Sequence, residues 1–178
     1  MVKERDKSTH EEDEEISQKL SEEYSDALLD AIQNGASLKD VQGITDQTMQ
    51  GVYSLAYDFY SHGKLNDAES LFRFLCVYDF HNPEYAMGLA AVYQLKKNYH
   101  KAIDFYALAY SQAKDDYRPM FYAGQCNLML RRGVQAKRCF EIVANRCDDA
   151  FLKKKAEVYL SELQEINIKG DEDTPGDD

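Results

Sequence analysis

Histidines and cysteines are the residues in this chain that could bind a metal ion or act as nucleophiles. The four histidines are scattered and the four cysteines form no CxxC pair, so neither set has the spacing of a zinc site. The sequence also lacks a phosphate-binding loop, a dinucleotide-binding glycine motif and an HExxH motif. We therefore expect no enzyme activity, no cofactor and no metal, and four reduced thiols that are mostly buried.

Tyrosines recur instead at positions that could bind a peptide. Tyr53, Tyr57 and Tyr60 follow one another at helical spacing. A tyrosine ring offers apolar contact area, while its hydroxyl can hydrogen-bond a ligand. This combination suits an extended peptide whose apolar side chains enter pockets while polar groups hold its main chain. A periodic aromatic stripe is also commonly part of a core, so the interpretation depends on which helix faces are exposed.

One residue pattern recurs with a period of 34 residues between Leu55 and Phe140. Its columns are Ala68, Ala102 and Ala136; Phe72, Tyr106 and Phe140; and Ala56, Ala90 and Gly124. This period, with small and aromatic residues at fixed offsets, is typical of tetratricopeptide repeats. Each repeat is a pair of antiparallel helices that buries its apolar face by stacking on the next pair. The sequence therefore predicts an all-α fold of three tandem tetratricopeptide repeats in a right-handed superhelix, with an N-terminal helix and a C-terminal capping helix.

The predicted elements divide the chain into four parts. Residues 1–15 are expected to be a disordered, charged N-terminus, and residues 16–48 an N-terminal helix and a connector. Residues 49–168 hold the repeats and the capping helix, and residues 169–178 a disordered acidic tail. The expected helices are Met49–Ser61, Leu65–Tyr78, Pro83–Leu95, Tyr99–Ala113, Tyr117–Leu130, Val134–Arg146 and Asp149–Ile168, with Gly63 in the first inter-helix turn.

The net charge of the chain is −11 and is concentrated at its ends. Residues 1–15 carry three basic and seven acidic groups, and residues 169–178 carry one basic and five acidic groups. Nucleic acid is held mostly by clustered Lys and Arg, so it is not expected as a direct partner. No apolar run approaches the ~20 residues that span a bilayer, and the N-terminus has no signal-peptide pattern. These features favour a soluble, cytoplasmic protein that does not insert into membranes.

The first helix of each pair is expected to line the concave face of the superhelix. Counting along the 34-residue frame gives the candidate groove residues Tyr53, Tyr57, Tyr60, Met87, Ala91, Gln94, Leu95, Phe121, Gln125 and Leu128. For Tyr53 and Tyr57 we favour the groove over the core. For Met87, Phe121 and Leu128 both alternatives stay open. A clamp for an acidic C-terminus is not expected, because it needs Lys and Asn at positions that hold Tyr53, Tyr57 and Gly88 here.

Parts of the repeats carry a pattern more specific than the period alone. The stretches are Tyr57-Asp58-Phe59-Tyr60, Ala68-Glu69 with Leu71–Leu95, Asp116–Pro119 and Gly124-Gln125-Cys126. They resemble the class II chaperones of bacterial type III secretion systems, and among these the invasion-system branch, over roughly residues 16–163. The resemblance implies a cytoplasmic chaperone that lays short segments of two hydrophobic translocator proteins along the concave groove and keeps them apart before secretion.

Two further expectations come from that resemblance. Family members commonly form homodimers through the N-terminal helical region, here through Ile16, Leu20, Tyr24, Leu28 and Ile32. Members of the invasion branch also act, when free of clients, with an AraC-type transcription activator. An alternative is a regulatory scaffold whose main role is to bind a transcription factor, with client binding secondary.

Overall fold

The computed structural model describes residues 34–113 and 115–172, and their side chains as far as residue 165. The chain divides into two compact units, Met1–Asp46 and Gln47–Asp178. Every regular element in the described residues is a helix, numbered from α2. The all-α prediction is therefore confirmed.

The first unit contains a short helix that the sequence analysis did not predict. Helix α2 (Leu38–Val41) lies within the expected connector of residues 36–48. The Asp40 carboxylate accepts hydrogen bonds from the Ser37 backbone N–H (2.9 Å) and from the Ser37 hydroxyl (2.6 Å). This Ser-x-x-Asp pattern is a variant of the capping box, which stabilises the start of a helix where backbone donors have no partner within it.

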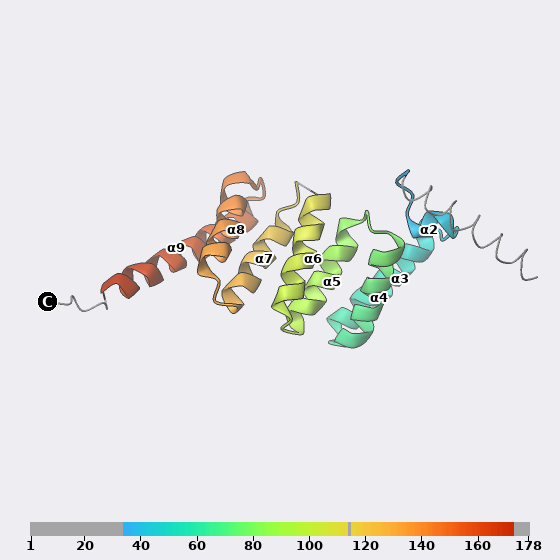
Figure 1. Cartoon of the computed structure of the whole chain (residues 1–178), viewed down its shortest axis with the longest axis horizontal. Helices are drawn as coiled ribbons and strands as arrows, with labels where there is room; N and C mark the ends of the chain where they lie inside the picture. The colour runs from blue at the N-terminus through green and yellow to red at the C-terminus, as the bar shows by residue number, and fades with distance from the viewer. Residues whose placement is uncertain (1–33, 114, 173–178) are drawn as a thin grey trace, which may run out of the picture. The chain divides into compact units, whose positions relative to one another are not determined.

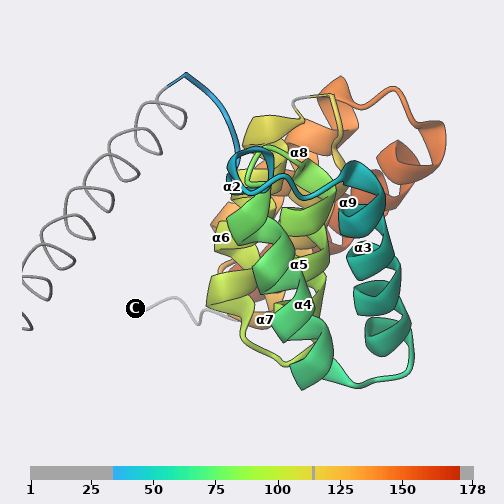
Figure 2. The same ribbon diagram turned by 90° about the vertical axis from the view of Figure 1, so that its right-hand side faces the viewer.

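The second unit is an array of paired helices. Its helices are α3 (Asp46–Ser61), α4 (Leu65–Tyr78), α5 (Pro83–Leu95), α6 (Tyr99–Gln112), α7 (Arg118–Met129), α8 (Gly133–Arg146) and α9 (Ala150–Glu172). They follow one another along the array in chain order (Figure 1), and the end-on view places α3 and α4 nearest the viewer (Figure 2). The pairs α3/α4, α5/α6 and α7/α8 are the three predicted repeats. Helix α9 ends four residues beyond Ile168, so it includes the start of the predicted acidic tail.

The columns of the 34-residue period form the core of this array. Both the small and the aromatic column are at most 2% exposed: Ala68, Ala102, Ala136, Phe72, Tyr106 and Phe140. The Phe140 ring lies against Gly124, where an added Cβ would be 2.7 Å from Phe140 Cε1. The Phe72 ring lies against Gly88 in the same way. Since Cβ atoms essentially never come this close to another carbon, both crossings depend on glycine.

The turn within each repeat contains one residue with a positive φ angle. Gly63 (73°), Lys97 (59°) and Arg131 (57°) lie 34 residues apart, so the same turn geometry recurs. In a residue with a Cβ this left-handed conformation costs about 1–2 kcal/mol. Gly63 was predicted at its turn. The strain at Lys97 and Arg131 was not, because neither residue type marks a left-handed turn.

We expect Lys97→Gly and Arg131→Gly each to raise the free energy of unfolding. Relief of the left-handed strain exceeds the extra freedom of glycine in the unfolded chain, for a net gain of about 0.5–1 kcal/mol. Urea denaturation followed by circular dichroism would measure the gain. Gly63→Ala is the reverse control and should lower the free energy of unfolding by about 1 kcal/mol. Destabilisation by both glycine substitutions would contradict this account.

Candidate functional site

A pocket of about 390 Å³ opens among α3, α5 and α7 of the second unit, and we call it the groove. Its lining residues are Tyr53, Tyr57, Tyr60, Phe72, Glu84, Met87, Gly88, Ala91, Gln94, Leu95, Tyr106, Arg118 and Tyr122. All the groove residues predicted in the first two repeats are among them. The structure therefore brings these seven residues together around one pocket, since helix pairs that stack in register place equivalent positions on the same face.

The three groove residues predicted in the third repeat lie elsewhere. Phe121 is 3% exposed and packs in a core cluster with Phe140, at a ring distance of 5.7 Å. Leu128 packs against the same cluster. The core alternative therefore holds for these two residues. Gln125 donates a hydrogen bond to Tyr159 Oη of α9 (2.9 Å) and, with Phe121, lines a separate pocket between α7 and α9.

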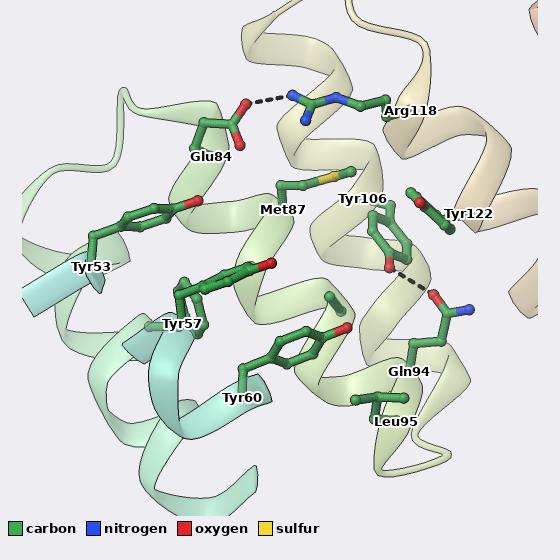
Figure 3. Close-up of a pocket in the computed structure, with 13 residues that line it drawn as sticks. Tyr53, Tyr57, Tyr60, Glu84, Met87, Gln94, Leu95, Tyr106, Arg118 and Tyr122 are labelled. Carbon is green, nitrogen blue, oxygen red and sulfur yellow. Dashed lines mark hydrogen bonds and ion pairs between the residues drawn. The ribbon is translucent and has the colours of Figure 1, made fainter. Parts of the chain in front are cut away.

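Three aromatic residues of the groove, Phe72, Tyr106 and Tyr122, are not among the predicted groove residues. Tyr106 comes from α6, the second helix of its pair, and its O–H donates to Gln94 Oε1 at 2.7 Å (Figure 3). Tyr122 comes from α7, and its ring stacks on Tyr106 with centroids 5.7 Å apart. Counting only the inward positions of first helices cannot find them. The hydroxyl of Tyr106 could have indicated its position. A phenol in a core column needs a hydrogen-bond partner, and Gln94, a predicted groove residue, supplies it.

The tyrosines of α3 supply both apolar surface and hydrogen-bond donors to the groove. Figure 3 shows Tyr53, Tyr57 and Tyr60 projecting from α3 into the space beside Met87 of α5. Tyr57 is 57% exposed, an unusual position for a large aromatic side chain without a ligand. Burial, as the largest cause, raises the pKa values of Tyr53 and Tyr60 above their ordinary value. Both phenols are therefore protonated at neutral pH and can donate to a peptide carbonyl.

An ion-pair cluster closes one end of the groove. Arg118 Nη2 lies 2.5 Å from Glu84 Oε1 and 2.7 Å from Asp116 Oδ2, and Arg118 Nε donates to both carboxylate oxygens of Asp116. Glu84 and Arg118 occupy the same position in successive repeats, so the pair ties the start of α5 to the start of α7. Hydrogen bonds to Asp116 and then Glu84 raise the pKa of Arg118. Its charge is already matched by two carboxylates, which leaves this end of the groove slightly acidic.

A second polar cluster fixes α4 against the end of α5. Lys96 Nζ lies 2.5 Å from Glu69 Oε2 and 2.8 Å from Asn66 Oδ1, and the Tyr93 hydroxyl donates to Glu69 Oε1 at 3.1 Å. The hydrogen bond from Lys96 is the largest cause that lowers the pKa of Glu69 below its ordinary value of 4.5, and burial opposes it. The cluster therefore needs the ionised carboxylate.

We expect the stability of the chain to depend on the ionisation of Glu69 in acid. Because the pKa of this group is lower in the folded state, its contribution is complete above about pH 4.5 and is lost as the pH falls through the lower, folded value. Glu69→Gln should therefore be less stable than the parent chain at pH 7, with a smaller difference at pH 3. Thermal unfolding at the two pH values would measure both. A difference that is the same at pH 7 and pH 3 would contradict the assignment.

All four cysteines lie in the described residues and none forms a disulfide. Cys126 and Cys147 are buried, Cys76 and Cys139 are half-buried, and all four are unpaired. Burial raises the pKa values of Cys76 and Cys126 to about 12, so both thiols stay protonated. Over residues 34–113 and 115–172, no group of histidine, cysteine and acidic side chains could hold a metal ion, and no helix has the length and apolarity to cross a membrane.

Comparison with known proteins shows which family the chain belongs to. The family model for the tetratricopeptide repeat matches residues 49–82 and 83–116, the first two helix pairs. Chaperone protein SicA of Salmonella typhimurium is 52% identical over 143 residues, which cover 80% of this chain and 87% of SicA. A crystal structure of the Yersinia enterocolitica type III secretion chaperone SycD in complex with a peptide of the translocator YopD aligns with a TM-score of 0.64 at 27% identity, over 70% of this chain and 98% of SycD. The chain belongs to the tetratricopeptide-repeat chaperones of type III secretion translocators.

Three further proteins are similar to this chain over most of its length. Low calcium response locus protein H of Yersinia pestis is 30% identical, over 84% of this chain and 89% of that protein. A type III secretion complex from Aeromonas hydrophila aligns with a TM-score of 0.74 at 26% identity, over 79% of this chain and 97% of that chain. PcrH of Pseudomonas aeruginosa in complex with the chaperone binding region of PopD aligns with a TM-score of 0.66 at 26% identity, over 70% and 97%. The resemblance noted in the sequence is therefore confirmed.

Proposed function

We propose that the chain is a bacterial cytoplasmic chaperone that binds short segments of two hydrophobic translocator proteins in the groove. The observation that carries this proposal is the open, tyrosine-lined groove in a chain of this family. SycD has been crystallised with a YopD peptide and PcrH with the chaperone binding region of PopD, which supports a peptide as the ligand. Bound in this way, the translocators would not associate or aggregate before secretion. The proposal assigns no catalytic step to the chain.

The groove can replace the apolar contacts that a translocator would otherwise make with itself. Met87, Ala91 and Leu95 provide the α5 wall, opposite the tyrosines of α3. Each large apolar side chain of a client that is buried there stabilises the complex by roughly 1.5–3 kcal/mol. Three such anchors would give micromolar or tighter binding after the cost of ordering the segment. The tyrosine hydroxyls and the Gln94 amide would hold the client main chain.

Overlapping 12-residue peptides that tile the translocators of the chain's own secretion system would test this function. Isothermal titration calorimetry should find at least one segment in each translocator that binds the full chain. The bound segments should carry apolar residues at alternate or nearly alternate positions. Failure of every peptide to bind, while the folded chain also fails to keep either translocator soluble on co-expression, would overturn the proposal.

Two narrower parts of the proposal rest on the family resemblance. Homodimerisation through Ile16, Leu20, Tyr24, Leu28 and Ile32 concerns residues outside the described part of the chain. The structure of SycD in an alternative dimer supports self-association in the family. Sedimentation of the full chain and of a Leu20→Asp/Leu28→Asp variant would test this interface, and an unchanged dimer in the variant would contradict it.

Action with an AraC-type transcription activator, in the client-free state, is the second part. A target promoter fused to a reporter, in cells that lack the translocators, should respond to this chain only when the activator is present. The same experiment separates the two roles. A chain that drives the promoter but binds no translocator would be a regulatory scaffold.

A further inference from the structure

A second pocket, which we call the α9 pocket, lies between α7 and α9 and has a volume of about 310 Å³. Its rim and walls are Tyr122, Gln125, Leu152, Lys155, Val158 and Tyr159. Tyr122 lines the groove as well, so the two pockets meet at this one side chain. A chain that leaves the groove over Tyr122 therefore arrives at the α9 pocket.

Helix α9 continues the 34-residue frame of the repeats. Gln125 and Tyr159 are 34 residues apart and are joined by the hydrogen bond from Gln125 Nε2 to Tyr159 Oη. In the same column, Tyr57 and Ala91 line the groove. Helix α9 is thus the first helix of a fourth repeat, and the α9 pocket occupies the same inward face as the groove.

Helix α9 exposes apolar side chains on one face. Val158 stands in the column of Ala90 and Gly124, which are both buried, yet Val158 is 54% exposed. Phe151, about two turns earlier on the same face of α9, is 69% exposed. Exposed apolar surface beside a preformed pocket marks a binding surface more often than a neutral one.

The polar groups of the α9 pocket match an acidic, extended ligand. Lys155 Nζ lies 4.3 Å from the centroid of the Phe151 ring, and no carboxylate among the described residues pairs with it. The Tyr159 hydroxyl accepts a hydrogen bond from Gln125, so its own proton can still be donated to a ligand carbonyl.

We propose that the α9 pocket is a second subsite for the same client segment, which takes one large apolar side chain and places a neighbouring Asp or Glu beside Lys155. The inference rests on the proposed function of the groove and extends it. The groove already reaches α7 through Arg118 and Tyr122, so the client has only the step from α7 to the packed helix α9 left, which is about 10 Å. An extended chain covers this distance in about three residues.

Peptides of two lengths separate the subsites. The short probe is the 12-residue translocator segment that binds the groove. Two long probes each add eight native residues to this segment, one at its N-terminal end and the other at its C-terminal end. On the parent chain, one of the two long probes should bind about ten-fold more tightly than the short probe. Val158→Glu should remove this gain. Val134→Glu, at a 65%-exposed valine of α8 that lines neither pocket, is the matched control and should retain it.

The role of the Lys155 charge is tested by a separate pair of substitutions. Lys155→Glu should weaken binding of the long probe by about ten-fold. Replacing the acidic residue of that probe by lysine should restore its binding to the Lys155→Glu variant but not improve its binding to the parent chain. Equal gains in Val158→Glu and Val134→Glu, or no gain from either extension, would overturn the subsite while leaving the groove intact. A short probe that fails to bind the parent chain would overturn the groove and, with it, the subsite.

Discussion

Replacing Tyr53 and Tyr57 together by alanine should weaken binding of a translocator segment by about 100-fold or more. Each ring is expected to bury against the client and to contribute roughly 1.5–3 kcal/mol, so the combined loss exceeds two powers of ten. Isothermal titration calorimetry with the 12-residue segment would measure it. Retention of full affinity by a folded double variant would contradict the groove assignment.

Controls for this prediction follow from how the two rings are packed. Tyr53 also contacts Phe72 and Tyr85, at ring distances of 5.9 and 5.7 Å, so its loss will lower stability as well. Tyr57 is more exposed, and Tyr57→Ala alone should reduce affinity with little change in the free energy of unfolding. Tyr99→Ala, at a tyrosine of α6 outside the groove, should leave affinity unchanged.

Gly88→Ala should destabilise the chain by about 2–3 kcal/mol, whereas Gly51→Ala should stabilise it by about 1 kcal/mol. A Cβ at Gly88 would lie 2.6 Å from Phe72 Cζ and closer still to Cε1, so the Phe72 ring, which is 2% exposed, would have to shift from its packed position. A Cβ at Gly51, within α3, meets nothing within 4 Å. At Gly51 the substitution therefore changes stability only through the higher helix propensity of alanine.

Urea denaturation would measure the change in the free energy of unfolding for both variants. The two substitutions are chemically identical, and their expected effects have opposite signs. Gly124→Ala should also destabilise the chain, because a Cβ there would lie 2.7 Å from the Phe140 ring. Stabilisation by Gly88→Ala would show that the crossing of α4 and α5 is looser than the structure indicates.

The repeat period predicted most of the fold because stacked helix pairs repeat their contacts. Two helices, Leu65–Tyr78 and Pro83–Leu95, have the predicted bounds, and the buried alanine column lies where the pattern placed it. The period could not show that α9 continues the frame, because Leu152 and Val158 do not resemble the residues of earlier repeats. It also could not show α2, whose start depends on a local bond between Ser37 and Asp40.

The candidate site was predictable only in part, for a different reason. Tyr53, Tyr57 and Tyr60 line the groove, but at the third repeat α9 packs against Phe121 and leaves a separate pocket beside it. The ring of Phe121 packs edge-on against both Phe140 and Tyr159, which stack on each other, whereas Met87, one repeat earlier, lines the groove. The inward residues near the end of the array are covered by the last helix, whereas earlier ones remain accessible. The repeat period does not encode this packing.

A crystal structure of the full chain with a bound translocator segment would test the central claim most directly. The account predicts an extended segment in the groove, with apolar side chains against Tyr57, Met87 and Leu95 and its main chain hydrogen-bonded to tyrosine hydroxyls. A segment bound only to the α4, α6 and α8 surfaces, with the groove empty, would contradict it.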